Sequence, residues 1–267
     1  MFELQDKVIV ITGATGALGG VLALSLAKAK AQLVILGRNR RLLDELASKL
    51  TSHTRVHIFV VDVMNRSDLI QVRKEVMSKF DRIDVLINAV GGNLPGAVIP
   101  DDKSVFDLSE IDIDQVVDLN LKGTLLPSLV FGVVMSQKGK GSIINYSSMA
   151  VDRVITRVLG YSASKAAMEN FTRWMAVEMA LKFGDGIRVN AIAPGFFIGK
   201  QNKDLLLNQD GSLTERGQKI IRNTPMQRFG EAEELNGPIQ FLCSDSASFV
   251  TGIVLPVDGG FSAYSGV

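Results

Sequence analysis

Short apolar runs rich in Val, Ile and Leu alternate with longer amphipathic stretches along most of the chain. The runs have the length of strands and the stretches between them have helical periodicity, which is typical of βαβ units in a parallel sheet. The apolar runs are unbroken, so we expect both faces of the sheet to be covered. The expected strands are 8–12, 33–36, 56–61, 85–88, 142–147, 188–192 and 253–257, and the expected helices are 18–30, 41–50, 67–80, 113–136, 162–183 and 232–243.

These elements predict an α/β chain with a doubly wound Rossmann fold, a seven-stranded parallel sheet with helices on both faces. No interior stretch has the composition of a linker, so we expect residues 1–267 to form a single domain. Two segments interrupt the alternation, 91–107 and 196–227. A segment as long as the second is usually functional inside a compact domain, and we expect it to be a substrate lid.

Composition narrows the classes of protein. Charges interrupt each apolar run before it reaches membrane-spanning length, and a net charge of +1 gives no general attraction to nucleic acid or anionic lipid. Cys243 is the only cysteine, which excludes an intrachain disulfide and argues against a cysteine-based zinc site, so no metal is expected. The first residues lack the features of a signal peptide, and we expect a cytoplasmic protein.

A glycine-rich turn joins the first expected strand to the first expected helix. It reads Thr12-Gly13-Ala14-Thr15-Gly16-Ala17-Leu18-Gly19. Glycines let the backbone approach a pyrophosphate, whose charge is favoured at a helix N-terminus. A tight turn would also explain the glycines, but their place between this strand and this helix favours a dinucleotide site.

The second expected strand ends in Leu36-Gly37-Arg38, without the acidic residue that an NAD site usually places there. Arg38 therefore favours NADP(H), and NAD(H) stays open because the same arginine could be solvated at a helix start. Asp62, at the end of the third strand, is a candidate to meet the adenine amino group or to cap its loop.

Tyr161 and Lys165 lie four residues apart at the start of an expected helix, on one face of it. A tyrosine with an ordinary pKa of about 10 is rarely ionised at pH 7, and a nearby ammonium, aided by an oxidised nicotinamide, would lower that pKa. Tyr161 could then exchange a proton with a substrate oxygen. This spacing also occurs by chance, so its meaning depends on the rest of the chain, including Ser148 at the end of the fifth strand.

Taken together, the motifs resemble those of the short-chain dehydrogenase/reductase family over about residues 5–262. They are the glycine turn, Asn88-Ala89-Val90-Gly91, Asn120, Ser148, Tyr161 with Lys165, Asn190 with Pro194-Gly195, and Val257-Asp258-Gly259-Gly260. The resemblance implies an NAD(P)(H)-dependent oxidoreductase that interconverts a secondary alcohol and a ketone. It also implies a homotetramer.

The resemblance assigns roles to single residues. Tyr161 would be the acid/base, Ser148 would hydrogen-bond the reacting oxygen, and Lys165 would also hold the nicotinamide ribose. Asn120 would anchor a water that connects Lys165 to solvent. The cofactor contacts would be Gly13, Thr15, Gly16, Leu18, Gly19, Arg38, Asp62, Val63, Asn88, Gly91, Tyr161, Lys165, Pro194, Gly195 and Phe197. Ala17, Ala89 and Gly199 depart from the usual family pattern.

Polar loops around the expected site favour a hydroxylated substrate, either neutral or anionic. The Gly91-Gly92-Asn93 turn and the run from Phe196 to Gly211 look like those of the D-mannonate oxidoreductases (fructuronate reductases) of this family. That would imply reduction of D-fructuronate to D-mannonate, with Lys200 or Arg153 facing the carboxylate. The candidate substrate contacts are Asn93, Ser148, Arg153, Lys200 and Asn202.

Three other functions stay open at this point. A gluconate 5-dehydrogenase-like enzyme or a 3-oxoacyl thioester reductase would use the same core. A nucleotide-sensing regulatory protein would bind the cofactor without turnover.

Overall fold

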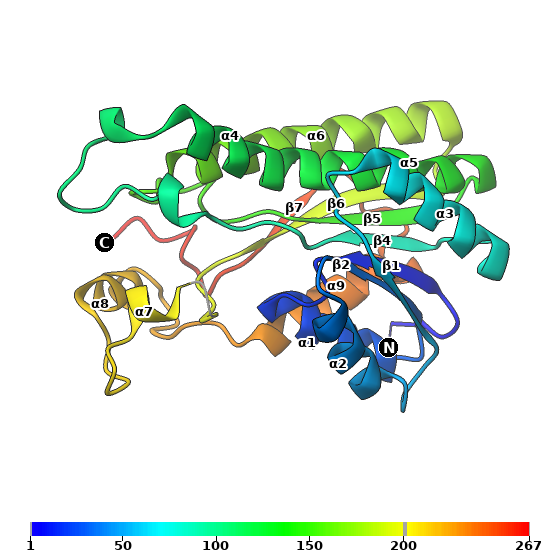
Figure 1. Cartoon of the computed structure of the whole chain (residues 1–267), viewed down its shortest axis with the longest axis horizontal. Coiled ribbons are helices and arrows are strands. Elements are labelled where there is room, and N and C mark those ends of the chain that lie inside the picture. Colours follow the sequence, from blue (N-terminus) through cyan, green and yellow to red (C-terminus); the bar gives the residue numbers. More distant parts are fainter. Residues whose placement is uncertain (1, 200–201, 267) are drawn as a thin grey trace.

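The computed structural model describes residues 2–199 and 202–266. Within them a single sheet of seven parallel strands has the order β3-β2-β1-β4-β5-β6-β7 (Figure 1). The predicted doubly wound sheet is therefore confirmed. The strands are β1 (Val8–Thr12), β2 (Gln32–Gly37), β3 (Val56–Val60), β4 (Val85–Asn88), β5 (Gly141–Tyr146), β6 (Ile187–Pro194) and β7 (Val254–Val257).

Helices cover both faces of this sheet. The α-helices are α1 (Ala17–Lys28), α2 (Arg40–Leu50), α3 (Arg66–Phe80), α4 (Glu110–Val117), α5 (Gly123–Lys138), α6 (Leu159–Phe183), α7 (Lys203–Leu206), α8 (Glu215–Arg222) and α9 (Asn236–Cys243). Shorter turns are η1 (Pro95–Ala97), η2 (Val105–Asp107), η3 (Asp118–Lys122), η4 (Ala232–Leu235) and η5 (Asp245–Ala247). In Figure 1, α1, α2 and α9 lie on one side of the sheet, and α3, α5 and α6 on the other.

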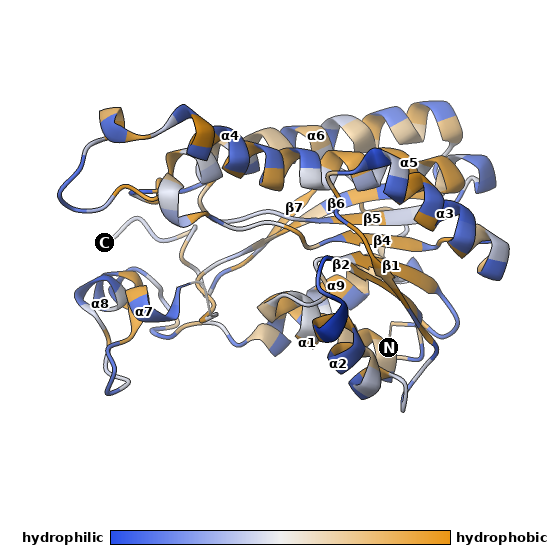
Figure 2. Ribbon diagram, in the orientation of Figure 1, coloured by the Kyte–Doolittle hydropathy of each residue, from blue (hydrophilic) through white to orange (hydrophobic). Residues whose placement is uncertain are grey.

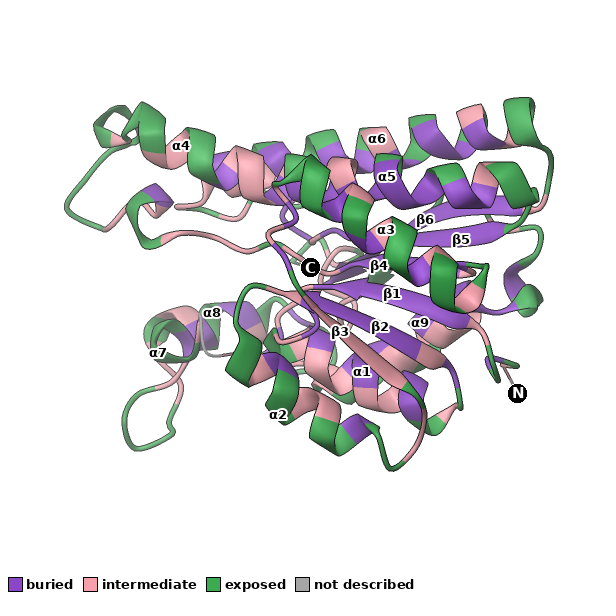
Figure 3. Cartoon of the chain, turned by 45° about the vertical axis from the view of Figure 1, so that its right-hand side comes forward, coloured by how far each residue is buried: buried purple, intermediate pink, exposed green. Residues whose placement is uncertain are grey.

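The core is split into two layers by the alternation of side chains along each strand. On β1, Val8 and Val10 pack with residues of α3, α5 and α6, whereas Ile9 and Ile11 pack with residues of α1, α2 and α9. Figure 3 shows the central strands buried between helices whose outer surfaces are exposed. Apolar residues at consecutive positions of a strand such as β1 are thus explained by burial on both faces.

The strand register aligns the carboxyl ends of the central strands. Thr12 is level with Asn88, Asn88 with Asn145, and Tyr146 with Ile192. The loops that leave these strands therefore meet along one edge of the sheet, where ligands of doubly wound folds bind.

The predicted helix 113–136 is wrong in one respect, because a π-helical turn, η3, separates α4 from α5. The side-chain amide of Asn120 donates to the carbonyl oxygen of Val116 at 2.8 Å, the acceptor that an α-helix would give to the backbone N–H of Asn120. Such π turns are often found at functional sites. The stretch Glu110–Lys138 is long and apolar enough to cross a membrane, but 56% of its most apolar window is buried, as expected of a helix in the core.

Candidate active site

The turn between β1 and α1 approaches the end of β4 closely. Gly13 has a φ of +66°, and a Cβ there would lie 2.6 Å from the carbonyl oxygen of Ala89. Gly16 is the N-cap residue of α1 and has no side chain with which to cap the free N–H groups of the first turn. These groups and the helix dipole favour an anion. The turn from Gly13 to Gly19, with Thr15 within it, therefore fits the pyrophosphate of a nicotinamide dinucleotide.

The adenosine side of this turn is lined by the ends of β2 and β3. Arg38 is exposed and has no hydrogen bond or ion pair to another described residue. A carboxylate oxygen of Asp62 accepts the backbone N–H of Met64 at 3.0 Å, so Asp62 caps its own loop. Val63 is buried and Leu18 is partly buried. At the ends of β2 and β3, Arg38 is thus a charged residue without a partner among the described residues, and its guanidinium can bind a ligand.

Tyr161 and Lys165 lie on the first turns of α6, beside the end of β5. The Nζ of Lys165 lies 5.7 Å from the ring centroid of Tyr161 and donates to the main-chain carbonyl of Tyr146 at 2.6 Å. Lys165 is 2% exposed, and Tyr161 is partly buried. Ser148, two residues past the end of β5, is hydrogen-bonded to the phenol of Tyr161. The three predicted catalytic side chains are therefore together.

Burial sets the protonation of this group. It raises the pKa of Tyr161, an effect that the hydrogen bond with Ser148 opposes. It also lowers the pKa of Lys165 to about 8, against the pull of the Glu169 carboxylate. The expectation that Lys165 lowers the pKa of Tyr161 is not met in the chain alone, because desolvation of the phenolate outweighs the other effects.

Asn120, in the π turn, holds the Gly91-Gly92 turn beside Lys165. Its Oδ1 accepts the N–H of Gly92 at 3.0 Å, and its Nδ2 donates to the carbonyl of Gly92 at 2.8 Å. A Cβ on Gly91 would lie 2.8 Å from Oδ1 of Asn120 and 3.0 Å from Nζ of Lys165, so only glycine fits there. Both N–H groups of the Asn120 amide are used, and Oδ1 keeps one lone pair beyond its contact with Gly92, so the predicted water site stays a prediction.

Asn88 belongs to a buried polar chain beneath the site. Its Nδ2 donates to Oγ of Ser128 and to Oδ1 of Asn145, both at 2.9 Å. Nδ2 of Asn145 in turn donates to Oγ1 of Thr172 on α6 at 2.9 Å. The Asn88 side chain thus ties β4 to β5 and α5, and its buried Oδ1 has no partner among the described residues.

The end of β6 is fixed against β7. The N–H of Gly195, directly after Pro194, donates to the carbonyl of Val257 at 2.9 Å. Phe197 is 8% exposed and packs in the core layer that contains α1 and α9. The side chain of Phe197 therefore supports the end of β6 from within the core.

Two predicted substrate ligands are engaged elsewhere. Arg153 donates from Nε and Nη2 to the carbonyl oxygen of Ser262, from Nε at 2.8 Å. Asn202 accepts the N–H of Gly199 at 2.8 Å and donates to the carbonyl of Phe197 at 2.9 Å, so its amide closes a turn of its own loop. The roles of Asn202 and Arg153 as substrate ligands stay predictions: the Asn202 amide is used within its own loop, whereas the exposed Arg153 keeps Nη1 without a partner among the described residues.

The other two predicted ligands differ. Lys200 lies outside the described residues. Both amide atoms of Asn93 are shielded from solvent, and neither has a hydrogen-bond partner in the described part of the chain. A buried amide without partners is costly, which makes Asn93 a candidate to bind a ligand.

The sequence reasoning missed a buried carboxylate at this site. Glu169, one helical turn beyond Lys165, is 1% exposed and accepts the hydroxyl of Ser147 at 2.5 Å. Its other oxygen lies 3.1 Å from Nη2 of Arg173. The signal was present, because Glu169 follows Lys165 by four residues and shares its helix face.

Comparisons with known proteins agree with this geometry. A family model described as enoyl-(acyl carrier protein) reductase matches residues 13–262. An uncharacterized oxidoreductase of Bacillus subtilis is 43% identical over 275 residues, which cover 99% of this chain and 98% of the relative. The 3-oxoacyl-[acyl-carrier-protein] reductase of Thermotoga maritima is 33% identical over 264 residues, with 97% and 98% covered.

One solved structure is also similar over its whole length. It is a Haemophilus influenzae protein with bound NAD, provisionally assigned as a D-mannonate oxidoreductase. It is 42% identical, with a TM-score of 0.91, and the match covers 100% of this chain and 98% of that one. Its NAD gives no support to the NADP(H) preference inferred from Arg38. From these matches, the protein belongs to the short-chain dehydrogenase/reductase family and is a nicotinamide-dependent oxidoreductase that acts on CH–OH groups.

Proposed function

We propose that this enzyme reduces the ketone of D-fructuronate to give D-mannonate. The observation that carries the chemistry is the meeting of Tyr161, Ser148 and Lys165 at one edge of the sheet. The choice of substrate is supported by the likeness to the provisionally assigned D-mannonate oxidoreductase.

Each catalytic side chain has a defined task in this proposal. A nicotinamide cofactor bound at the glycine turn supplies the hydride. Tyr161 donates its phenolic proton to the ketone oxygen, and the burial that raises its pKa keeps the phenol protonated beforehand. Ser148 donates a hydrogen bond to the same oxygen. The ammonium of Lys165 stabilises the phenolate that Tyr161 becomes.

We assign residues 196–227 to a substrate lid on a single domain of residues 1–267. This segment contains α7 and α8, which lie beyond the carboxyl ends of the strands (Figure 1). The loop with Asn93 leaves β4 at the same edge of the sheet. A substrate between them would give the amide of Asn93 its missing partners.

The choice between NADP(H) and NAD(H) depends on Arg38. Its exposed guanidinium after β2 supports NADP(H), because a 2′-phosphate would find a cation there. The NAD in the similar Haemophilus structure supports NAD(H). Steady-state kinetics with both cofactors decide between them.

A homotetramer is the proposed assembly. Large apolar side chains are exposed on α5 and α6, including Leu129 (46%), Trp174 (60%) and Val177 (59%), and near β7, where Phe249 is fully exposed. Figure 2 shows apolar segments along α5 and α6, whereas α2 is largely polar. Two separate apolar areas suit an assembly with two kinds of two-fold contact. Light scattering should give four times 28.9 kDa.

We also propose a cytoplasmic enzyme. Its one cysteine, Cys243, is buried and has a thiol pKa raised to about 12 by burial, so this thiol is unreactive. A nicotinamide cofactor and a small sugar acid are both available in the cytoplasm. Fractionation of cells that express the tagged chain would test this location.

A substrate panel tests the proposed reaction. Ketouronates, ketogluconates and acetoacetyl thioesters are each offered with NADH and NADPH, and D-fructuronate is expected to give the highest kcat/KM. A clear preference for a 5-ketogluconate or for a thioester would replace the proposed substrate by one of those alternatives. Cofactor binding without turnover of any of them would indicate a regulatory protein.

A further inference from the structure

Two loops and one helix that border the candidate site each contribute a charged residue to one cluster. Asp101 lies in the loop after β4, Arg157 lies in the loop between β5 and α6, and Arg216 lies on α8. Arg157 precedes the catalytic Tyr161 by four residues. Figures 1 and 3 both place α8 and the loop after β4 at the same end of the molecule, beyond the carboxyl ends of the strands.

Arg157 is held in a fixed position. Its Nε donates to the carbonyl of Ile99 at 2.7 Å, and its own carbonyl accepts the N–H of Ile99 at 3.0 Å. Its φ of +78° is in the left-handed region, which a residue with a side chain adopts only when its surroundings impose it. The guanidinium is therefore preorganised. One of its terminal nitrogens lies 3.4 Å from Asp101, and Nη2 has no partner among the described residues.

Arg216 is a cation in an unfavourable place. It is the second residue of α8, where the helix dipole disfavours a positive charge, and it is partly buried. It has no hydrogen bond or ion pair within the described part of the chain. Burial and the nearby Arg157 both lower its pKa, and only the carboxylate of Asp101 opposes them. Because the Asp101 side chain is 92% exposed, water screens most of its effect.

An anion between the two guanidinium groups would offset the three effects that are unfavourable for Arg216: the helix dipole, burial, and the positive charge of Arg157. Of the cations that the sequence offered for a substrate carboxylate, Arg153 already donates two N–H groups to the carbonyl of Ser262. In fructuronate the carboxylate and the ketone stand toward opposite ends of the carbon chain. The site that binds the carboxylate must therefore lie away from Tyr161, which contacts the ketone oxygen. Guanidinium groups bind carboxylates with two parallel hydrogen bonds, which gives orientation as well as charge.

We propose that Arg157 and Arg216 form the subsite that binds the carboxylate of a hydroxy-acid substrate. This rests on the proposed sugar-acid function and deepens it, because it names the side chains that distinguish an acid from a neutral sugar. Arg157 gives a fixed contact from the catalytic layer, and Arg216 gives a second one from α8.

The test is a comparison of two ligands that differ only at the acid end. D-Mannonate and D-mannitol are titrated by calorimetry into the enzyme saturated with NADH, where no reaction follows. The parent enzyme should favour D-mannonate. Arg216→Gln should weaken D-mannonate binding by about ten- to a hundred-fold, as expected for loss of a hydrogen bond between charged groups, and leave D-mannitol binding unchanged.

Matched variants separate this role from a general effect of charge. Lys219→Gln removes a cation from the same helix, one that is exposed and paired with Glu215, and should leave both affinities unchanged. Asp101→Asn removes the carboxylate that partly neutralises the pair and should tighten D-mannonate binding. Arg157→Gln should act like Arg216→Gln. If a lowered thermal midpoint shows that Arg157→Gln has a folding defect, the binding data for Arg216→Gln alone decide whether the subsite exists.

The outcomes are distinguishable. If the parent prefers D-mannonate and Arg216→Gln keeps that preference, the subsite is wrong while the sugar-acid function stands. Equal binding of the two ligands by the parent overturns both. Loss of the preference in Arg216→Gln, with Lys219→Gln unaffected, supports the subsite.

Discussion

Two buried cations lie at opposite edges of the same sheet, and burial has different consequences for their charge. Lys165 lies at the carboxyl edge and is 2% exposed, and Arg188 lies at the amino edge of β6 and is 7% exposed. Burial lowers the pKa of both. The lysine pKa falls to about 8, within reach of physiological pH, whereas a guanidinium starts so high that it stays charged.

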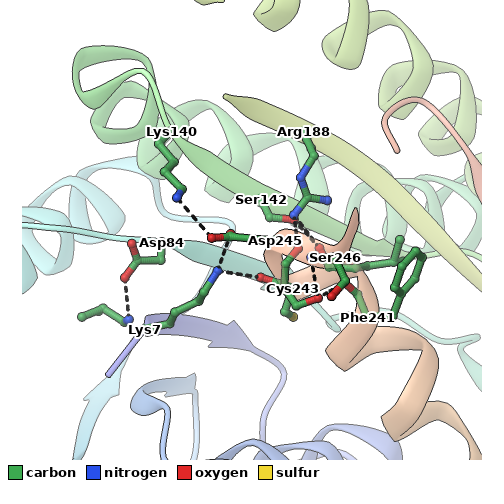
Figure 4. Close-up of polar contacts among 12 residues, drawn as sticks. Lys7, Asp84, Lys140, Ser142, Arg188, Phe241, Cys243, Asp245 and Ser246 are labelled. Atoms are coloured by element: carbon green, nitrogen blue, oxygen red, sulfur yellow. Dashed lines mark hydrogen bonds and ion pairs between the residues drawn. The ribbon is translucent and has the colours of Figure 1, made fainter. Parts of the chain in front are cut away.

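The amino edge is a network of largely paired groups, shown in Figure 4, although Nη1 of Arg188 is buried without a partner among the described residues. Arg188 donates to the carbonyls of Leu242 and Ser244 at 2.9 and 3.1 Å. Asp245 pairs with Lys7 at 2.8 Å and with Lys140 at 3.3 Å. These contacts join β1, β5 and β6 to the end of α9. Such a cluster of ion pairs and hydrogen bonds stabilises the fold.

The carboxyl edge leaves its polar groups less satisfied. Lys165 has one main-chain acceptor and a neighbouring carboxylate, Glu169, that is shared with Ser147 and Arg173. The amide of Asn93 is shielded and unpaired among the described residues. The comparison shows that burial alone does not make a site. A titratable group and open hydrogen-bonding capacity must coincide with it.

The largest expected effect comes from a matched pair of tyrosines. Tyr161→Phe should lower turnover by about a thousand-fold, because the ring remains but has no proton to donate, and cofactor binding should remain. Tyr146→Phe makes the same change on β5, where the buried hydroxyl has no partner among the described residues and the carbonyl used by Lys165 is kept. It should be nearly neutral. Steady-state kinetics and cofactor titration measure both, and equal effects would break the comparison.

The two buried cations can be exchanged for the same apolar residue. Lys165→Met should lower turnover by at least about a hundred-fold with little loss of stability, since a buried charge is replaced by a side chain that packs. Arg188→Met should lower the free energy of unfolding by about 1–3 kcal/mol, because two hydrogen bonds from a charged donor are lost. Each carbonyl keeps a second donor, Oγ of Ser142 or the N–H of Ala247.

Denaturant unfolding and kcat per folded enzyme, measured on both variants, give the answer. Arg188→Met should keep its kcat below the onset of unfolding. Two results would contradict the assignment of catalysis to the carboxyl edge and of stability to the amino edge. One is a catalytic loss in Arg188→Met, and the other is a stability loss in Lys165→Met as large as that of Arg188→Met.

Much of the fold was readable from sequence because it depends on local pattern. Unbroken runs such as the one in β1 report burial on both faces, and the strand limits of β1 and β4 agree with the prediction. The π turn was not predictable, because it depends on one side chain, Asn120, capturing the Val116 carbonyl. Hydrophobic periodicity contains no record of that contact.

The candidate site divides in the same way. Tyr161 and Lys165 were found because their spacing is fixed within one helix. The backbone partners of Arg153 and Asn202 were not foreseen, because composition does not tell which groups meet in folded loops. Arg216 was missed because its candidate role depends on Arg157, which lies in a loop distant in sequence.

Arg38 sharpens the comparison with Arg188, because it is a guanidinium at the carboxyl edge without a described partner. If it meets a 2′-phosphate, Arg38→Asp should lower the ratio of NADPH to NADH efficiency by about ten- to a hundred-fold. NADH has only a hydroxyl at that position and should suffer less, or gain if the new carboxylate reaches the ribose. Kinetics with both cofactors measure this ratio. A parent that already prefers NADH, with an unchanged ratio in the variant, would remove the phosphate role.

The smallest expected effect concerns how Glu169 tunes Lys165. Ketone reduction needs a charged Lys165, so its rate should decline as pH rises through the lysine pKa of about 8. The Glu169 carboxylate raises that pKa, and Glu169→Gln removes the charge while keeping an oxygen for the Ser147 hydroxyl. The decline should therefore begin about half a unit to one unit lower in pH. Glu178→Gln, which breaks the ion pair with Lys182 on the same helix, should not move it. A pH profile of kcat/KM that is identical for Glu169→Gln and the parent would show that the Glu169 carboxylate does not help to keep Lys165 charged against the effect of burial.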